Sequence, residues 1–309
     1  MCSLLASILF DHKRRSTSTK NLDLANLDRA PPNPPEPMIS RHLQLKEITS
    51  PANHLLKQGK ALHDRPGREK SKLFLIEGAK LVMEAIDRKL EVLDIVVSET
   101  FVKQGLPNFD QQKVKYLHVM PDKLFAELST TTTPTGMAAI ARMREFTLED
   151  CLKKENPVLM VCDSIQDPGN LGTMMRSALA FGASGMLLSK GCVDCFNPKV
   201  VRGGMGASFG LPIVRDVEIA EVFEDLHTRG FVTVLVDPRA EKSIFELNMM
   251  QPIAFVFGNE GHGFKESTAE NVKEKVLIPM ENDTESLNVS ISAAITMFEW
   301  ARQRKTARQ

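Results

Sequence analysis

Three polar loops, each placed after an apolar run typical of a strand, hold the residues best suited to chemistry. The first loop is 163–172 and leads into a helical pattern that contains Arg176. The second loop is 258–263, and the third ends in Ser286-Leu287-Asn288. Because ligands of open α/β sheets bind beyond the carboxyl ends of the strands, the three loops are expected to form one site.

The second and third loops suit a polar ligand that is held by the backbone. Gly258, Gly261 and Gly263 permit positive φ angles and close approach of a ligand. A helix is expected to begin at Ser286 as its N-cap, with free N–H groups beside the loop. An ordinary capped C-terminal helix is the alternative. The glycine order differs from the dinucleotide-binding fingerprint, and no P-loop, H-E-x-x-H or G-x-S-x-G motif is present.

The elements that position these loops alternate between strand and helix patterns. Strands are predicted at 158–163, 185–189, 231–237, 253–258 and 275–279. Helices are predicted between them at 171–181, 219–229 and 264–272. This alternation predicts an α/β domain over 150–309, with a mostly parallel sheet covered on both faces.

A smaller α/β domain is predicted over 41–145. Its strands are expected at 73–77, 92–98, 114–120 and 137–142, and its helices at 79–89 and 121–128. The hydroxyl-rich loop 129–136 either binds RNA or is a simple turn. The segment 41–72 has eight Lys or Arg against three acids and either contacts phosphates or forms a solvated helical face. The basic residues proposed for RNA are Lys57, Lys60, Arg65 and Arg68.

Composition sets broad limits on the 309-residue chain. Apolar residues make up 42% and charged residues 25%, which is typical of globular domains. The formal net charge is zero, so affinity for RNA requires local basic patches. No run is long and apolar enough to span a membrane. Five irregularly spaced cysteines favour a reducing compartment, and Cys192-x-x-Cys195 lacks a second pair, so no metal site is expected.

The N-terminal residues 1–40 are expected to lie outside the folded domains. Residues 1–22 contain Lys13, Arg14, Arg15 and Lys20 against one acid, which favours a mitochondrial transit peptide. A disordered cytosolic tail is the alternative. The proline-rich run 31–37 predicts a stiff linker.

Taken together, the three loops resemble the three motifs of the SpoU/TrmH 2′-O-ribose methyltransferases of the SPOUT class. The matching residues are Asn170 with Arg176, then Gly258-x-Glu260-x-x-Gly263, then Ile278-Pro279-Met280 with Ser286-Leu287-Asn288. The resemblance covers 156–304. Residues 73–143 resemble the L30e-like substrate-binding domain of many members, and 190–207 resembles the rRNA methyltransferase 3 type found in mitochondria.

The resemblance implies a homodimer whose catalytic domain contains a C-terminal trefoil knot that binds S-adenosylmethionine. Gly258, Ile278 and Leu287 match positions whose backbone holds the adenine and ribose of the cofactor. Arg176 matches the residue proposed to activate the ribose 2′-hydroxyl. The matched residues that orient the hydroxyl and the RNA are Asn170, Glu260, Ser286 and Asn288.

Other roles for these residues stay open. Arginine is an unexpected base because its pKa exceeds about 12, so Arg176 could instead pair with a phosphate or with Glu260. Asn170 could be only the N-cap of its helix, and Glu260 could only brace the glycine loop.

The resulting hypothesis is an S-adenosylmethionine-dependent 2′-O-methyltransferase that acts on rRNA, with mitochondrial large-subunit rRNA in the matrix as the expected target. A tRNA-directed or cytoplasmic relative is the alternative within enzymes. A non-catalytic RNA-binding ribosome assembly factor is the alternative from another class.

Overall fold

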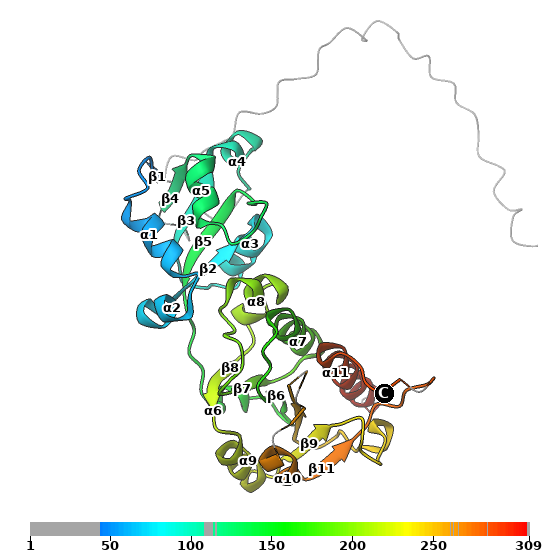
Figure 1. The fold of residues 1–309 in the computed structure, drawn as a ribbon. Coiled ribbons are helices and arrows are strands. Elements are labelled where there is room, and N and C mark those ends of the chain that lie inside the picture. Colours follow the sequence, from blue (N-terminus) through cyan, green and yellow to red (C-terminus); the bar gives the residue numbers. More distant parts are fainter. Residues whose placement is uncertain are drawn as a thin grey trace, which may run out of the picture. The chain divides into compact units, whose positions relative to one another are not determined.

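The computed structural model describes residues 44–107, 114, 116–259, 261, 263–264, 266–282 and 284–307 (Figure 1). The expected transit peptide and linker lie outside the described residues, and so do Glu260 and His262. Residues 39–309 fall in one compact unit, which contains two separate sheets.

The first sheet has five strands in the order β1-β4-β3-β5-β2. The strands are β1 (Gln44–Glu47), β2 (Leu73–Glu77), β3 (Val92–Ser98), β4 (Tyr116–Met120) and β5 (Met137–Arg142). β4 pairs in parallel with β1 and β3, whereas β5 runs antiparallel to β3 and β2. The predicted bounds of β2, β3 and β5 are confirmed; β1 was not predicted.

Within the described residues, five α-helices accompany the first sheet. They are α1 (His54–Ala61), α2 (Arg65–Ser71), α3 (Ala79–Asp87), α4 (Glu99–Gln104) and α5 (Asp122–Leu128). The apolar face of α3 packs into one core cluster, and Phe125 of α5 packs into a second cluster. The helix α4 was not predicted. Pro121 precedes α5 as its N-cap and was wrongly predicted to lie within its first turn.

The second sheet has six parallel strands in the order β11-β9-β10-β6-β7-β8. The strands are β6 (Val158–Cys162), β7 (Gly185–Ser189), β8 (Ile213–Val217), β9 (Val232–Val236), β10 (Ile253–Phe257) and β11 (Glu274–Val276). Every residue of β6, β7 and β10 is buried. Burial on both faces explains their continuous apolar sequences, and the predicted parallel α/β sheet is confirmed.

The second sheet is covered by six α-helices and two 3₁₀ helices within the described residues. They are α6 (Leu148–Cys151), α7 (Pro168–Phe181), α8 (Pro198–Gly203), η3 (Ala207–Phe209), α9 (Ile219–Thr228), η4 (Ile244–Glu246), α10 (Glu266–Glu270) and α11 (Val289–Thr306). The strand β8 and the helix α8 were not predicted. The trefoil knot and the L30e-like class of the first sheet remain predictions.

The start of α11 corrects the sequence analysis. The helix begins at Val289, and its N-cap is Asn288 instead of Ser286. The Asn288 Oδ1 atom accepts a hydrogen bond from the Ser290 N–H at 2.9 Å, which satisfies a free donor of the first turn. Ser286 and Leu287 therefore belong to the loop and remain available to a ligand.

Candidate functional site

A pocket of about 590 Å³ lies where β9 and β10 end and α11 begins. Most of its lining residues belong to three stretches of the chain: 236–239, then 257–259 with 261, 263 and 264, and 286–289. The pocket brings together Gly258, Ser286, Leu287 and Asn288 of the second and third loops, whereas the first loop, 163–172, does not line it. Its position beyond the carboxyl ends of parallel strands is the usual place for a ligand in this kind of sheet.

Position 258 requires glycine because there is no space for a side chain. A Cβ atom there would lie 2.4 Å from Phe264 Cδ1 and 2.7 Å from the Gly263 carbonyl oxygen. Among the three loop glycines, all described, only Gly263 has a positive φ, of 70°. Gly258 and Gly261 therefore do not adopt the positive φ angle that glycine permits. The loop closes through paired backbone hydrogen bonds of 2.9 and 3.0 Å between Asn259 and Gly263.

The side chain of Asn259 joins the first loop to the second. Its Nδ2 donates to the Ser164 carbonyl oxygen at 2.8 Å, and its Oδ1 accepts from the Gly261 N–H at 2.9 Å. The side-chain amide of Asn259 thereby holds the first loop against the second. This residue was within the predicted loop, but its role as a connector was not predicted.

The carboxylate of Asp163 lies beneath these loops and is buried. It accepts hydrogen bonds from Ser164 Oγ and Ser189 Oγ, both at 3.1 Å, and from Thr268 Oγ1 at 2.7 Å. Three hydroxyl donors compensate the cost of burying this acceptor. Thr268 belongs to α10, so Asp163 ties the helix after the glycine loop to the end of β6.

The first and third loops meet through Asn170 and Asn288. Asn288 Nδ2 donates to Asn170 Oδ1 at 3.0 Å, although the two residues are 118 positions apart in the sequence. The N-cap of α7 is Asp167, whose Oδ1 accepts from the Asn170 N–H at 2.8 Å. The alternative that Asn170 caps its own helix is therefore wrong, and its side chain faces the third loop.

Arg176 and Ile278 do not line the described pocket. Arg176 is exposed on α7, two turns after the start of that helix. Ile278 is half-buried and packs against the main core cluster. Glu260 lies outside the described residues.

Asp237 and Arg239 line the same pocket and were missed as site residues. The Arg239 guanidinium donates to Asp237 from Nε at 3.0 Å and from Nη2 at 3.1 Å. Burial acts to raise the pKa of Asp237, but the hydrogen bonds from Arg239 outweigh it and lower the pKa. The sequence feature that could have identified these two residues is the polar turn 237–239. It directly follows β9, at the same edge of the sheet as the other loops.

Two sets of side chains considered for RNA contact, in the loop 129–136 and at Arg68, have partners within the protein. The hydroxyls of Ser129, Thr130 and Thr131 donate to the buried carboxylate of Glu77 at 2.5, 3.0 and 3.0 Å. These three hydroxyls brace the loop, whereas Thr132, Thr133 and Thr135 are exposed. Arg68 is only 1% exposed, so it cannot contact phosphates.

The described part of the chain lacks both a metal-binding cluster and a membrane-spanning helix. Within it, no group of three or more His, Cys, Asp or Glu side chains is arranged to hold a metal ion. Cys192 and Cys195 are free and buried, and burial raises the pKa of the Cys192 thiol. No described helix is long and apolar enough to cross a membrane.

Comparison with known proteins identifies the enzyme class. The SpoU rRNA Methylase family matches residues 157–298, and the MRM3-like substrate binding domain matches residues 53–139. A crystal structure of an RNA 2′-O ribose methyltransferase is 34% identical, with a TM-score of 0.71, over 84% of this chain and 99% of that one. The AdoMet complex of the SpoU methyltransferase AviRb from Streptomyces viridochromogenes is 26% identical, with a TM-score of 0.73, over 82% and 99%.

Two curated relatives narrow the comparison. The 23S rRNA (guanosine(2553)-2′-O)-methyltransferase RlmP of Bacillus subtilis is 32% identical over 82% of this chain and 98% of its own. The human mitochondrial rRNA methyltransferase 3 is 28% identical over 77% of this chain and 70% of its own. The chain belongs to the SpoU rRNA methylase family. The predicted enzyme class, an RNA (ribose-2′-O)-methyltransferase, and the predicted cofactor, S-adenosylmethionine, are thereby confirmed.

Proposed function

We propose that this chain methylates a ribose 2′-hydroxyl of large-subunit rRNA in mitochondria. The observation that supports the reaction best is that the second and third loops line one pocket, to which the hydrogen bond between Asn170 and Asn288 joins the first loop. The rRNA target is supported by the substrates named for RlmP and for the mitochondrial relatives. A tRNA target and a cytoplasmic location are the alternatives.

The pocket suits the cofactor on physical grounds. Apolar side chains of Val236, Phe264 and Leu287 offer contacts to an adenine ring, and Gly258 lets Phe264 pack closely against the backbone of the pocket wall. We assign Gly258, Ile278 and Leu287 to the backbone cradle of the adenosine part. When bound, S-adenosylmethionine supplies the electrophilic methyl group.

The remaining residues act on the acceptor hydroxyl. A ribose hydroxyl is a poor nucleophile and requires a base or strict orientation. We assign activation or orientation of this hydroxyl to Arg176, with support from Asn170, Glu260, Ser286 and Asn288. The contact between Asn170 and Asn288 would keep α7, which carries Arg176, in a fixed place relative to the third loop.

The proposed activity predicts that the purified full chain binds S-adenosylmethionine in calorimetry and incorporates methyl groups into unmodified large-subunit rRNA. Mapping ribose methylation in RNA from cells that lack the protein should show one site lost, which identifies the nucleotide. Cofactor binding without methyl incorporation into any rRNA would favour a tRNA target. Absence of cofactor binding would support the non-catalytic assembly factor.

The location is tested separately. A C-terminal fluorescent tag on the full chain should label mitochondria, and deletion of residues 1–22 should release the label to the cytosol. A diffuse cytosolic signal from the full chain would contradict the mitochondrial proposal.

A homodimer is proposed from the exposed side of α11. Ile291 and Phe298 are 47% and 55% exposed, whereas Ala293 and Met297 of the same helix are buried. Residues seven positions apart lie on one helix face, so the two exposed side chains form an apolar strip. The Phe298 ring also meets the Phe181 ring of α7 edge-on, at 5.9 Å between centroids. Symmetric pairing of such faces is the commonest way to cover them.

The dimer proposal predicts that Phe298→Asp converts the protein to a monomer, because a charge in an apolar interface is costly. Light scattering at micromolar concentration measures the mass. The matched control is Phe245→Asp, since Phe245 is 66% exposed but lies in η4, away from the strip. A monomeric wild-type protein would contradict the proposal, as would a Phe298→Asp variant of unchanged mass.

A further inference from the structure

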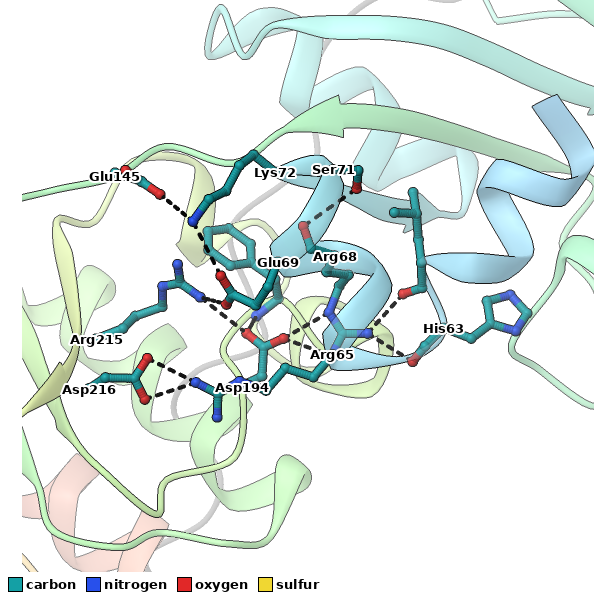
Figure 2. Close-up of polar contacts among 12 residues, drawn as sticks. His63, Arg65, Arg68, Glu69, Ser71, Lys72, Glu145, Asp194, Arg215 and Asp216 are labelled. Carbon is teal, nitrogen blue, oxygen red and sulfur yellow. Dashed lines mark hydrogen bonds and ion pairs between the residues drawn. The ribbon is translucent and has the colours of Figure 1, made fainter. Parts of the chain in front are cut away.

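A cluster of charged side chains joins the segment around α2 to the second sheet (Figure 2). We call it the ion-pair cluster, and it consists of Arg65, Arg68, Glu69, Asp194, Arg215 and Asp216. The first three belong to α2, which lies between β1 and β2 of the first sheet in the chain. Asp194 lies in the loop after β7, and the last two lie in β8.

Arg68 and Asp194 form the buried centre of this cluster. Arg68 Nε and Nη2 lie 2.8 and 2.7 Å from Asp194 Oδ2. Arg68 Nη1 donates to the carbonyl oxygens of Leu62 and His63, both at 2.8 Å. Asp194 Oδ1 accepts the Phe196 N–H at 2.9 Å. The side chains are 2% and 4% exposed, so this pair is shielded from solvent and salt.

The outer pairs are weaker and exposed to different degrees. Arg215 Nη1 lies 2.5 Å from Glu69 Oε1 and 3.9 Å from Asp194 Oδ1. Arg65 Nη2 lies 2.8 Å from each carboxylate oxygen of Asp216, and both side chains are nearly half exposed. Exposed pairs contribute little to stability, so the geometry of the junction depends mainly on the buried pair.

The loop that holds Asp194 also touches the first loop of the site. The Val193 N–H donates to the Ile165 carbonyl oxygen at 2.8 Å. Ser189 Oγ, at the end of β7, accepts from the Ser164 N–H at 2.9 Å. Asp167, which follows Ile165 by two residues in the first loop, caps α7, and this helix contains Asn170 and Arg176. Arg68 is therefore linked to α7 through its ion pair with Asp194 and the hydrogen bond from the neighbouring Val193 to the loop that leads into this helix.

We propose that Arg68 and Asp194 are positioning residues, which fix the N-terminal RNA-binding part in register with the loop 163–167 and the helix α7. The proposal rests on the proposed function, because it assigns the pair a role in placing the target ribose. A buried ion pair adds little net stability, since desolvation offsets its attraction, but it requires a defined geometry. Here the planar guanidinium binds one carboxylate and two carbonyls at once, which fixes three chain segments together.

The test uses full-length protein and unmodified large-subunit rRNA on which the wild type is active. The double variant Arg68→Met/Asp194→Leu removes both charges while keeping similar volume, so no unpaired buried charge remains. Single-turnover methyl transfer at saturating RNA is expected to fall about 10²-fold, the effect of misplacing reacting groups by about 1 Å. Calorimetric affinity for S-adenosylmethionine should not change, because its pocket lies on other loops.

A conservative variant and a control complete the design. Arg68→Lys keeps the charge but loses the fork of donors, so the same rate constant should fall while the RNA dissociation constant is retained. Asp216→Asn removes an exposed pair of the same cluster and should leave the rate unchanged. Wild-type single-turnover rates in the double variant and in Arg68→Lys would overturn the proposal. A wild-type protein that methylates no rRNA would instead contradict the proposed function.

Discussion

Arg176→Ala is expected to lower the single-turnover rate of methyl transfer by about 10²–10⁴-fold at saturating RNA, the usual range for a positioned base. Arg176 is exposed on α7, six residues after Asn170, which contacts Asn288 of the third loop. Its guanidinium is therefore available to substrate on a helix that is tied to the site. The affinity for S-adenosylmethionine should change little, because Arg176 does not line the described pocket.

Arg176→Lys serves as the matched variant. It keeps the positive charge but loses the planar, two-pronged donor geometry, so it should recover only part of the rate. Full recovery would indicate that charge alone is sufficient. An alanine variant that reacts at the wild-type rate with saturating RNA would show that Arg176 has no role in the chemical step. A fall confined to subsaturating RNA would assign Arg176 to phosphate binding.

Strands that are buried on both faces were predicted well, because continuous apolar runs leave little ambiguity. β2, β3, β5 and β7 have the predicted bounds, and β6 and β10 differ by one residue. In contrast, β8 has the sequence IVRDV and was missed. Its charged residues are explained by partners distant in the sequence, since Arg215 meets Glu69 and Asp216 meets Arg65. The sequence pattern around β8 contains no information on ion pairs with residues that are distant in the chain.

The site was predicted where a motif combined a strand end with a polar loop. Gly258, Leu287 and Asn288 meet at one pocket, but the physical reason for Gly258 is space and not a positive φ. The sequence could not distinguish these reasons, because both favour glycine. Asp237 was missed because its turn has no motif. The burial of Arg68 was missed because its partner, Asp194, lies 126 residues away.

Gly258→Ala is expected to weaken S-adenosylmethionine binding roughly 10–100-fold, which corresponds to an overpacking cost of about 1–3 kcal/mol. The added Cβ would meet Phe264 Cδ1 at 2.4 Å and the Gly263 carbonyl oxygen at 2.7 Å. Relief requires movement of Phe264 or of the Gly263 backbone, and both line the pocket. Either movement deforms the surface that the cofactor would contact.

Gly261→Ala is the matched control for this prediction. Its Cβ would lie 3.6 Å from Asn259 Oδ1, an ordinary contact, and φ at Gly261 is outside the left-handed region. The control should therefore leave the loop in place, and because Gly261 also lines the pocket, any loss of affinity should be smaller than that of Gly258→Ala. Calorimetry gives both affinities, and thermal melting without cofactor shows whether each variant is folded. If folded Gly258→Ala binds as tightly as Gly261→Ala, the cofactor does not depend on this loop, and its assignment to the pocket at the ends of β9 and β10 is wrong.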